Sequence, residues 1–307
     1  MKALVTGGAG FIGSNVVKEL LNHQWHVRVI DNLSSGYKCN LQGLDIDFRR
    51  GDIRDIVFVE EACRNMDVVF HLAANVGRQK SLNYPQTDSE VNVLGTINVL
   101  EGMRKHSVPK MIYSSSAAIF GELLTPEIAE DHPQNADSPY GVSKLAAEKM
   151  ILAYQGIYGI QCVCLRYFNI YGINQRYDLY GNVIPIFAQR LLEGASLTIY
   201  GDGTQTRDFL NVRDVARANR MAATGDKSGV YNLGSGSSIT IQELAEKMLA
   251  ISGGHSPITY LPRRPADVSH CKANASKIDR ELGFRASIPL DSGLQEYWNW
   301  FINRDNE

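Results

Sequence analysis

The sequence predicts an α/β protein, in which a doubly wound parallel sheet is followed by a smaller C-terminal α/β lobe. Short apolar runs alternate with helical patterns through the first half of the chain, as is typical of parallel strands joined by crossover helices. A glycine-rich turn directly follows the first of these runs. Beyond residue 168 the runs become shorter and less regular, which indicates a second, smaller unit. A chain of 307 residues is long enough for this arrangement.

The first predicted strand, residues 2–6, leads directly into a turn with glycines at positions 7, 10 and 13. Apolar residues then recur at helical spacing over residues 16–21. Between a strand and a helix, Gly7 permits a tight turn and Gly10 lets the backbone approach a pyrophosphate. Gly13 lets the helix pack close to the strand, and the helix N-terminus faces the phosphates. The pattern therefore predicts a Rossmann-type dinucleotide site.

An acidic residue indicates which dinucleotide binds. The second predicted strand, residues 26–30, is followed by Asp31, where a carboxylate can hold the hydroxyls of the adenosine ribose. The same charge would repel a 2′-phosphate, so the sequence favours NAD over NADP. A third strand, residues 47–53, ends in a loop where Asp52 and Ile53 are placed to bracket the adenine.

Two further strands end in small or hydroxyl side chains. The strand at residues 67–74 ends in Ala73 and Ala74, which would let a cofactor lie close, although simple packing explains them equally well. A long helix is predicted over residues 88–105. The next strand, residues 110–116, ends in three serines, which at the carboxyl end of a parallel strand point into the ligand crevice. Most such serines only satisfy backbone groups, so this feature alone is not decisive.

A tyrosine and a lysine four residues apart give the predicted site its chemistry. Ser138 can cap a helix, and Pro139 suits its first position. On that helix Tyr140 and Lys144 share a face. A neighbouring cation and the positive end of the helix favour the phenolate, so Tyr140 can accept a proton near neutral pH. Ser116 lies 24 residues earlier and can bring a hydroxyl beside the phenol. Such a pair on a helix is usually inert, so its interpretation as catalytic depends on the predicted cofactor site.

The second half of the chain reads as a smaller lobe of short elements. It carries several arginines near aromatic residues, which suits an anionic ligand with a flat ring, although surface ion pairs explain any single arginine equally well. From residue 161 onward, the predicted strands are residues 161–167, 197–200 and 207–212, the predicted helices are residues 183–192 and 240–252, and the predicted loops are residues 177–181 and 261–267.

Composition excludes several classes of function. Hydrophobic content of 44% and charged content of 21% are ordinary for a globular protein, and a net charge of -2 gives no reason to propose nucleic acid or an anionic membrane as a partner. No apolar run approaches the length of a membrane span, and no signal peptide is visible. The five cysteines form no C-x-x-C pair, so no metal site is expected, and reduced thiols in a cytoplasmic protein are favoured.

Eight short motifs together resemble the extended short-chain dehydrogenase/reductase family, and within it the nucleotide-sugar 4-epimerases of the UDP-glucose (UDP-galactose) type. The resemblance extends from the first strand to about residue 300. The motifs are TGGAGFIG at 6–13, DNLSSG at 31–36, HLAA at 71–74, SSSA at 114–117, YGVSK at 140–144, LRYFN at 165–169, RDF at 207–209 and RRPAD at 263–267. They are highly specific for the family and less specific for the reaction and the sugar.

The resemblance implies a catalytic group of three residues. Tyr140 would be the acid/base, and Lys144 would hold the nicotinamide ribose and lower the pKa of the tyrosine. Ser116 would hydrogen-bond the reacting sugar hydroxyl. Tyr167 would border the nicotinamide, and Asn92 would lie near the cofactor.

The resemblance also implies two sets of binding residues and a division of the chain. The set for NAD is Gly7, Gly10, Phe11, Ile12, Gly13, Asp31, Asn32, Ser34, Ser35, Gly36, Asp52, Ile53, Leu72, Ala73, Ala74, Asn92, Ser114, Tyr140, Lys144 and Tyr167. The set for the UDP-sugar is Ser116, Asn169, Asn182, Val183, Thr198, Tyr200, Arg207, Phe209, Arg264, Asp267 and Cys271. Residues 1–168 would then form the NAD-binding domain, to which residues 207–233 return, and residues 169–307 the nucleotide-sugar-binding lobe.

Some departures from the family pattern bear on the reaction. Related 4,6-dehydratases carry an acid pair directly after the serine or threonine of the fifth strand, and nucleotide-sugar decarboxylases also use an acid there. This chain has Ser116-Ala117-Ala118, so epimerisation ranks above both reactions. Ala118 stands where some epimerases have threonine, and Phe120 and Phe209 stand where some members have tyrosine.

The sequence therefore predicts an NAD-dependent enzyme that inverts C4 of a UDP-hexose through a 4-keto intermediate. The alternative enzyme is a 4-keto-sugar reductase, a net dehydrogenase or a 4,6-dehydratase on the same scaffold. Asp31 disfavours the reductase because it argues against NADPH. A catalytically silent NAD-binding sensor is disfavoured because Ser116, Tyr140 and Lys144 are all present. The family often dimerises through the helix after Asp88 and the helix at residues 140–153, so a homodimer is expected.

One cysteine bears on the choice of sugar. In the 4-epimerases a residue shortly after the RRxxD motif lies beside the C2 substituent of the sugar. Counting without gaps from Asp267 places Cys271 there. A tyrosine would crowd an N-acetyl group, whereas cysteine is small, so UDP-N-acetylglucosamine and UDP-N-acetylgalactosamine are expected substrates beside UDP-glucose and UDP-galactose. The alternative is that Cys271 is a small buried hydrophobe without a selective role.

Overall fold

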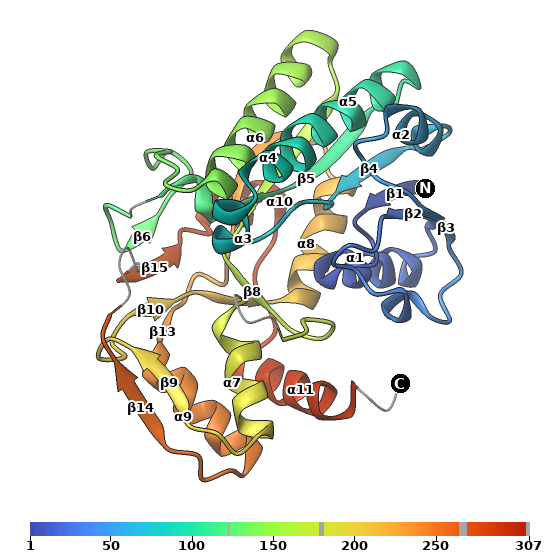
Figure 1. Ribbon diagram of the computed structural model, residues 1–307. Helices are drawn as coiled ribbons and strands as arrows, with labels where there is room; N and C mark the ends of the chain where they lie inside the picture. The colour runs from blue at the N-terminus through green and yellow to red at the C-terminus, as the bar shows by residue number, and fades with distance from the viewer. Residues whose placement is uncertain (122, 178–180, 264–268, 305–307) are drawn as a thin grey trace.

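A seven-stranded parallel sheet forms the main body of the computed structural model, which describes residues 1–121, 123–177, 181–263 and 269–304 (Figure 1). The strands are β1 (Lys2–Thr6), β2 (His26–Asp31), β3 (Asp47–Arg50), β4 (Val68–His71), β5 (Lys110–Ser116), β7 (Gln161–Tyr167) and β12 (Gly229–Leu233). Their order is β12-β7-β5-β4-β1-β2-β3. The order reverses between β1 and β4, and such a point opens a ligand crevice at the carboxyl ends of the strands. The predicted α/β fold is thereby confirmed.

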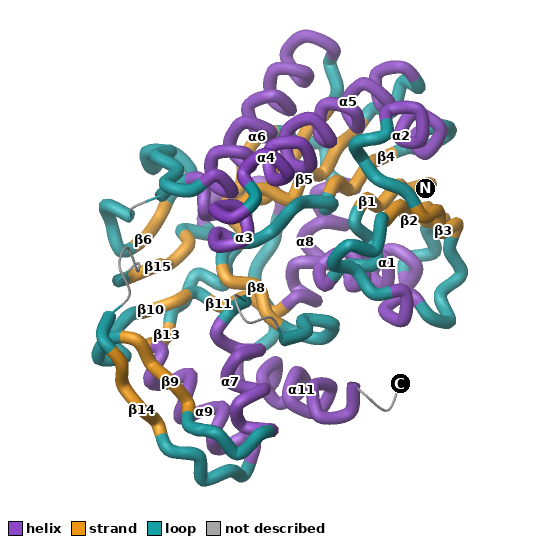
Figure 2. Tube along the Cα trace, in the orientation of Figure 1, coloured by secondary structure: helices purple, strands orange, loops and turns teal. Residues whose placement is uncertain are grey.

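Helices cover both faces of this sheet (Figure 1, Figure 2). They are α1 (Phe11–Asn22) and α8 (Val212–Thr224) on one face, and α2 (Ile56–Cys63), α5 (Gly95–Lys105) and α6 (Pro139–Tyr158) on the other. Successive residues of β1 show why both faces need cover. Ala3 and Val5 pack into the core on the side of α1 and α8, whereas Leu4 packs into the core on the other side. This alternation is what a strand buried on both faces requires.

The second half of the chain builds most of a smaller lobe, which lies below the large sheet in Figure 1. Its core includes Phe187, Leu244 and Tyr297. In the described part of the chain the lobe's helices are α7 (Val183–Leu192), α9 (Ile241–Ser252) and α11 (Leu290–Asn303). Two of its small sheets have two strands each: β8 (Asn169–Tyr171) pairs with β11 (Phe209–Asn211), and β9 (Leu197–Tyr200) pairs with β14 (Ile258–Leu261). A third sheet has four strands in the order β13 (Ile239–Thr240), β10 (Thr206–Arg207), β15 (His270–Ala273) and β6 (Glu127–Ile128).

Shorter elements connect these units. They are α3 (Arg78–Asn83), α4 (Pro85–Ser89) and α10 (Ser276–Leu282), with 3-10 turns at Lys38–Leu41 and Ala117–Ile119. None of the described helices combines the length and the apolar character that crossing a bilayer requires.

The predicted helix over residues 88–105 is not regular. The structure has α4, then a π-helical turn at Glu90–Leu94, then α5, in continuous succession. A π turn contains one residue more than an α-helical turn and is frequently found at functional sites. This one contains Asn92, one of the residues predicted to lie near the cofactor.

The predicted strand over residues 207–212 is split at Asp208, which is fully buried. Its carboxylate accepts hydrogen bonds from three backbone N–H groups, those of Ser235 at 2.7 Å, Gly236 at 3.1 Å and Ala273 at 3.1 Å. The residue before Asp208 pairs with β15 and the residue after it pairs with β8. The acid therefore ties together segments that the local sequence pattern does not connect.

The helix α6 begins where the sequence predicts. Ser138 Oγ accepts a hydrogen bond from Gly141 N at 3.3 Å, and Pro139 occupies the first helical position. The helix runs to Tyr158 and ends at Gly159, whose φ of 71° is a left-handed conformation that glycine adopts without strain.

His71, at the end of β4, is buried and links elements on both sides of it. Its Nδ1 lies 2.8 Å from Thr6 Oγ1 of β1, and its Nε2 lies 2.9 Å from Thr96 Oγ1 of α5. Thr96 Oγ1 gives its own hydrogen to the carbonyl of Asn92 at 2.6 Å, so it can only accept from His71. Nε2 therefore donates and Nδ1 accepts from Thr6, which fixes one neutral tautomer. Thr6 Oγ1 in turn accepts from Ala73 N at 3.1 Å.

This burial predicts a pH-dependent contribution to stability. Burial, with a smaller effect of nearby Lys144, lowers the pKa of His71 to about 3 from its ordinary value of 6.5. Because the folded pKa is depressed, the unfolded chain takes up a proton first, and stability is lost as the pH falls from 6.5 towards about 3. We expect the free energy of unfolding to fall more steeply over that window in the wild type than in His71→Gln, which cannot titrate. Denaturant unfolding at a series of pH values measures this, and parallel curves for the two proteins would contradict it.

Candidate active site

The glycine turn has the geometry that dinucleotide binding requires. A Cβ on Gly7 would lie 2.7 Å from Ala73 N, and one on Gly13 would lie 2.1 Å from Gly7 O, so both positions need glycine. A Cβ on Gly10 would meet only Gly7 O, at 3.2 Å, which leaves that side of the turn open. Gly10 caps α1 without a side-chain hydrogen bond, so the backbone N–H groups of the first turn are available to an anion.

Asp31 holds the other side of this turn. Its Oδ2 accepts from Ala9 N at 3.0 Å, and its Oδ1 accepts from Leu33 N at 2.8 Å. Burial raises the pKa of Asp31, and these two backbone donors oppose the rise. Gly36 approaches so closely that a Cβ there would lie 2.9 Å from Asp31 Oδ2. The loop at residues 31–36 therefore folds back onto the glycine turn.

Asp52 is fixed at the edge of the sheet beside Asn32. Asn32 Nδ2 donates to Asp52 Oδ2 at 2.8 Å, and Arg54 Nη2 donates to the same oxygen at 2.8 Å. These contacts, with Arg54 the stronger, hold the pKa of Asp52 well below its ordinary value. The neighbouring Ile53 is buried. The structure therefore gathers Asn32, Asp52 and Ile53 beyond the carboxyl ends of β2 and β3, where the sequence predicts the adenine.

These groups fit NAD. Backbone donors at a helix N-terminus suit a pyrophosphate, an acid after β2 suits ribose hydroxyls, and small side chains after β4 leave room for the cofactor. The remaining residues predicted for NAD around the turn are Phe11, Ile12, Leu72, Ala73 and Ala74, which are partly buried, and Ser34 and Ser35, which are exposed.

The Ser–Tyr–Lys group comes together at the carboxyl end of β5. Tyr140, on the first turn of α6, lies close enough to Ser116, the last residue of β5, for the serine hydroxyl to influence the phenol. Ser116 Oγ also accepts from Ala118 N at 3.1 Å, which orients the hydroxyl. Lys144 lies one turn further along α6, and its Nζ is 4.3 Å from the centre of the Tyr113 ring, a cation–π contact.

Burial dominates the titration of this group. It raises the pKa of Tyr140 to about 12, and the nearby Ser116 hydroxyl only partly opposes the rise. It lowers the pKa of Lys144 to about 7. The expected fall in the Tyr140 pKa beside Lys144 is therefore wrong for the polypeptide itself, because the loss of hydration is the largest effect on the phenol.

Tyr167, at the end of β7, is oriented by a residue that the sequence does not predict. Its hydroxyl lies 3.0 Å from Asn219 Oδ1 and 2.8 Å from Asn219 Nδ2, with Ser114 nearby. Asn219 is a buried residue of α8, and its Nδ2 also donates to Val215 O at 2.8 Å. The sequence around an asparagine in an amphipathic helix does not predict such a contact.

A buried ion pair fixes α6 against the sheet. Arg166 of β7 and Glu148 of α6 lie 2.7 Å apart, and their side chains are 1% and 0% exposed. Ser115 Oγ donates to Glu148 at 2.6 Å, and Arg166 Nη1 donates to the carbonyl of Glu130 at 2.7 Å. A buried pair needs such additional bonds to offset its lost hydration. The pair therefore ties the helix of Tyr140 to both β5 and β7.

Asn92 lies near the predicted site, but its side chain is occupied by the protein. Its Oδ1 accepts from Asn75 N at 2.7 Å, and its Nδ2 donates to Asn75 O at 3.1 Å and to Ser143 Oγ at 2.9 Å. These bonds use both of its amide hydrogens. Asn92 therefore connects the loop after β4 with α6 instead of offering a polar group to a ligand.

Four residues predicted for the nucleotide sugar gather where the small sheets meet. β10 runs parallel to β15, in a register that places Arg207 beside Cys271. Phe209 of β11 lies opposite Asn169 of β8. The Cys271 side chain is buried near Asn169. Burial raises the pKa of the Cys271 thiol to about 11, so this side chain is neutral.

The other residues predicted for the sugar lie on outer elements of the lobe. Asn182 is the N-cap of α7, and Val183 is its first residue. Thr198 and Tyr200 alternate with buried neighbours in β9, so they share one half-buried face.

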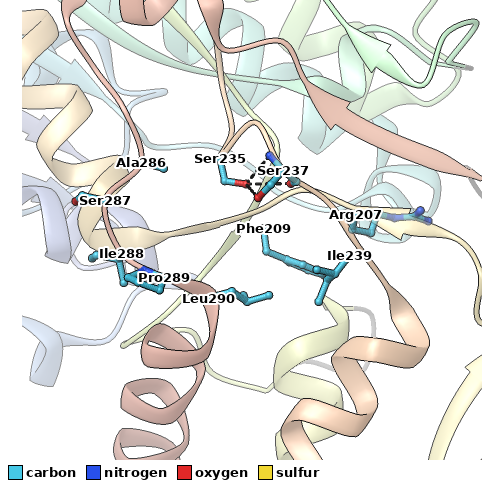
Figure 3. A pocket seen from close by; sticks show the side chains of 10 residues that line it. All are labelled: Arg207, Phe209, Ser235, Ser237, Ile239, Ala286, Ser287, Ile288, Pro289 and Leu290. Atoms are coloured by element: carbon cyan, nitrogen blue, oxygen red, sulfur yellow. Dashed lines mark hydrogen bonds between the residues drawn. The ribbon is translucent and has the colours of Figure 1, made fainter.

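A cavity of about 300 Å³ lies beside Arg207 and Phe209 (Figure 3). Its lining consists of Arg207, Phe209, Ser235, Ser237, Ile239, Ala286, Ser287, Ile288, Pro289 and Leu290. Tyr140 is not among these residues. The cavity therefore borders the sugar lobe and not the Ser–Tyr–Lys group.

Two predicted residues, Arg264 and Asp267, lie outside the residues that the structure describes. Within the described ranges, no three His, Cys, Asp or Glu side chains are close enough to hold a metal ion.

Sequence relatives match this chain over nearly its whole length. The NAD dependent epimerase/dehydratase family matches residues 3–234. A UDP-glucose 4-epimerase of Halalkalibacterium halodurans is 37% identical over 320 residues, covering 98% of this chain and 95% of that protein. A dTDP-glucose 4,6-dehydratase of an Actinoplanes species is 33% identical over 317 residues, covering 98% of each chain.

Solved structures show the same fold. A UDP-N-acetylglucosamine 4-epimerase from Methanobrevibacter ruminantium, in complex with UDP-N-acetylmuramic acid, has a TM-score of 0.94 at 34% identity and covers 99% of this chain and 98% of its own. A UDP-glucose 4-epimerase of Thermus thermophilus, in complex with NAD, has a TM-score of 0.90 at 36% identity and covers 98% and 99%. Since the family matches residues 3–234 and the relatives align over nearly the whole chain, this chain belongs to the NAD-dependent epimerase/dehydratase family, with NAD as its cofactor.

Proposed function

We propose that this protein is a 4-epimerase of UDP-hexoses. The observation that carries the proposal is the approach of the Tyr140 phenol to the Ser116 hydroxyl at the carboxyl end of β5, with Lys144 one turn away on the same helix. A sugar hydroxyl held by Ser116 would lie within reach of the phenol, as general acid–base catalysis requires. Relatives named as UDP-glucose and UDP-N-acetylglucosamine 4-epimerases support the substrate class.

In this proposal Tyr140 takes the proton of the sugar's 4-hydroxyl while Ser116 holds that hydroxyl in place. Bound NAD supplies a hydride acceptor and donor for C4, and its positive nicotinamide favours the phenolate. Lys144 adds positive charge on the same side and binds the nicotinamide ribose. After the 4-keto sugar has turned over, Tyr140 returns the proton to the new hydroxyl. Each proton and hydride that leaves the sugar is returned to it, so no net oxidation results.

The turn after Ser116 favours epimerisation over dehydration, although a 4,6-dehydratase is among the relatives. Dehydratases of the family carry an acid pair at this turn. Here the 3-10 turn Ala117–Ile119 presents only aliphatic side chains, and Ala118 N binds the hydroxyl of Ser116. Asp31 disfavours the reductase alternative, because its carboxylate suits NAD and would repel the 2′-phosphate of NADPH.

The first prediction concerns the proposed base. Tyr140→Phe removes only the phenolic hydroxyl, and we expect turnover of UDP-galactose to fall by ~10²–10⁴-fold. Tyr154→Phe is the matched control, because it removes a hydroxyl from the same helix where that group donates to Glu101 at 2.6 Å. The control should keep its turnover. Initial rates measured by chromatography decide, and near-wild-type turnover in Tyr140→Phe would contradict the proposed role.

The second prediction concerns the sugar. Cys271 is small and lies beside Arg207 and Asn169, so we propose that the pocket admits an N-acetyl group at C2. In Cys271→Tyr the overpacked site should lose about 1–3 kcal/mol, or roughly tenfold to a hundredfold in kcat/KM, for the N-acetyl sugars alone. Cys271→Ala, which stays small, should keep both activities. Rejection of N-acetyl sugars by the wild type, or an unchanged preference in Cys271→Tyr, would show that the pocket is assigned wrongly.

We also propose that the protein is a homodimer. α5 and α6 pack against each other, and α6 exposes the large apolar residues Val142, Ile157 and Tyr158. Covering that surface with a second copy would remove it from water. Light scattering should give twice the chain mass of 34.1 kDa. A monomer at micromolar concentration would contradict this.

A cytoplasmic location is proposed on chemical grounds. All five cysteines, Cys39, Cys63, Cys162, Cys164 and Cys271, are free thiols, which suits a reducing compartment. Cell fractionation tests the location, and recovery of the protein outside the cytoplasmic fraction would contradict it.

A further inference from the structure

Four buried residues form a closed ring of hydrogen bonds beside the first turns of α6, which carry Tyr140 and Lys144. Asn75 Nδ2 donates to Asp88 Oδ1 at 3.2 Å, and Ser143 Oγ donates to Asp88 Oδ2 at 2.5 Å. Asn92 closes the ring, because it bonds both Ser143 and the backbone of Asn75. The four residues are between 0% and 6% exposed, and Asp88 is the one at 0%. Low local dielectric makes such a network strong when it is fully satisfied.

The ring connects segments of the molecule that must keep fixed relative positions for the proposed reaction. Asn75 lies two residues after Ala73, whose backbone lies against Gly7 of the glycine turn. Ser143 directly precedes Lys144 and lies on the turn of α6 that also carries Tyr140. Asp88 belongs to α4 and Asn92 to the π turn that follows it. One carboxylate therefore connects the loop after β4 with α6.

Groups from every neighbouring element surround Lys144. They are Tyr113 of β5, His71 of β4, Cys164 of β7, Glu148 of its own helix and Asp88 of α4. Burial holds the pKa of Tyr113 and of Cys164 well above the ordinary values, and that of His71 well below, so all three are neutral. Glu148 is paired with Arg166. In the part of the chain that the structure describes, no lysine or arginine forms an ion pair with Asp88, whose partners are Ser143 and Asn75.

We propose that Asp88 is a positioning residue: its carboxylate fixes Ser143, and with it the turn of α6 that bears Tyr140 and Lys144, against the loop after β4. This inference rests on the proposed function, because it gives Asp88 a role in a reaction that Tyr140 and Lys144 perform. It also predicts an electrostatic effect, since the carboxylate is buried and lacks a guanidinium or ammonium partner.

The sign of that effect follows from the charges. A fixed negative charge favours the ammonium of Lys144 and opposes the phenolate of Tyr140, so it raises both pKa values. Removing the charge while keeping the shape should lower both. The two limbs of the pH profile of kcat report the apparent pKa values of the Tyr140–Lys144 pair, so both limbs should move to lower pH. A purely structural defect would lower kcat at every pH and leave the limbs in place.

The decisive variant is Asp88→Asn, which keeps the size of the side chain and removes its charge. We expect kcat for UDP-galactose to fall, by less than in Tyr140→Phe, and both limbs to shift to lower pH. KM should stay unchanged, because Asp88 contacts none of the residues proposed for the sugar. Asp214→Asn is the matched control, because Asp214 is a buried carboxylate of α8 that accepts from Ser287 N at 2.9 Å. It should lower the Tm without moving either limb. A pH profile of Asp88→Asn that superimposes on the wild type would overturn the inference.

A second variant separates the effect of the Ser143–Asp88 hydrogen bond from the effect of the Asp88 charge. Ser143→Ala removes the hydrogen bond and keeps the carboxylate, so kcat should fall while the limbs stay in place. This variant still tests the inference if Asp88→Asn does not fold, and a wild-type kcat in Ser143→Ala would overturn the positioning role.

A titration without substrate distinguishes failure of this inference from failure of the proposed function. In protein with ¹⁵N-labelled lysine, NMR should show the Lys144 ammonium titrating at lower pH in Asp88→Asn than in the wild type, with Lys144→Arg identifying the signal. If the wild type does not convert UDP-galactose, the proposed function fails while the titration still reports on Asp88. If the wild type converts the sugar and Lys144 titrates identically in both proteins, the inference about Asp88 alone is overturned.

Discussion

Tyr140 can act only while α6 keeps its phenol in contact with Ser116, so the packing of one helix against the sheet controls the whole site. Polar contacts that are buried or partly buried hold that helix. Ser138 caps its first turn, Glu148 pairs with Arg166 of β7, and Ser143 binds Asp88 of α4. Buried polar contacts tolerate little displacement, because each unpaired group would cost its full hydration energy. The helix is therefore fixed in position as well as in orientation.

The cofactor side depends on an equally strict steric constraint. Gly7 lies so close to the backbone of Ala73 that no side chain fits between β1 and β4 at their carboxyl ends. His71 and Thr6 bond each other directly beneath this contact. On the sugar side, Asp208 accepts hydrogen bonds from the backbone of two distant segments and so holds β10 beside β15. The register of Arg207 with Cys271, on which the proposed sugar preference rests, follows from that arrangement.

The sequence predicts those structural features that neighbouring residues determine. A strand followed by spaced glycines, an acid after the second strand and a Ser-Pro pair before a helical run each report on adjacent residues. The missed residues act over long sequence separations: Asn219 meets Tyr167 across 52 residues, and Asp208 meets Ala273 across 65 residues. The neighbouring sequence does not show whether an asparagine or aspartate is buried or exposed to solvent. The direction of the Tyr140 pKa was missed for the same reason, because it depends on burial by distant elements.

The central proposal is that the protein inverts C4 of a UDP-sugar without net oxidation. The most direct measurement is to incubate the purified protein with NAD and UDP-galactose, or separately with UDP-glucose, and to separate the sugar nucleotides by chromatography while following NADH by absorbance. We predict that either substrate gives the same mixture of the two sugars and that NADH does not accumulate. Steady accumulation of NADH, loss of water from the sugar, or unchanged substrate after long incubation would contradict the proposal.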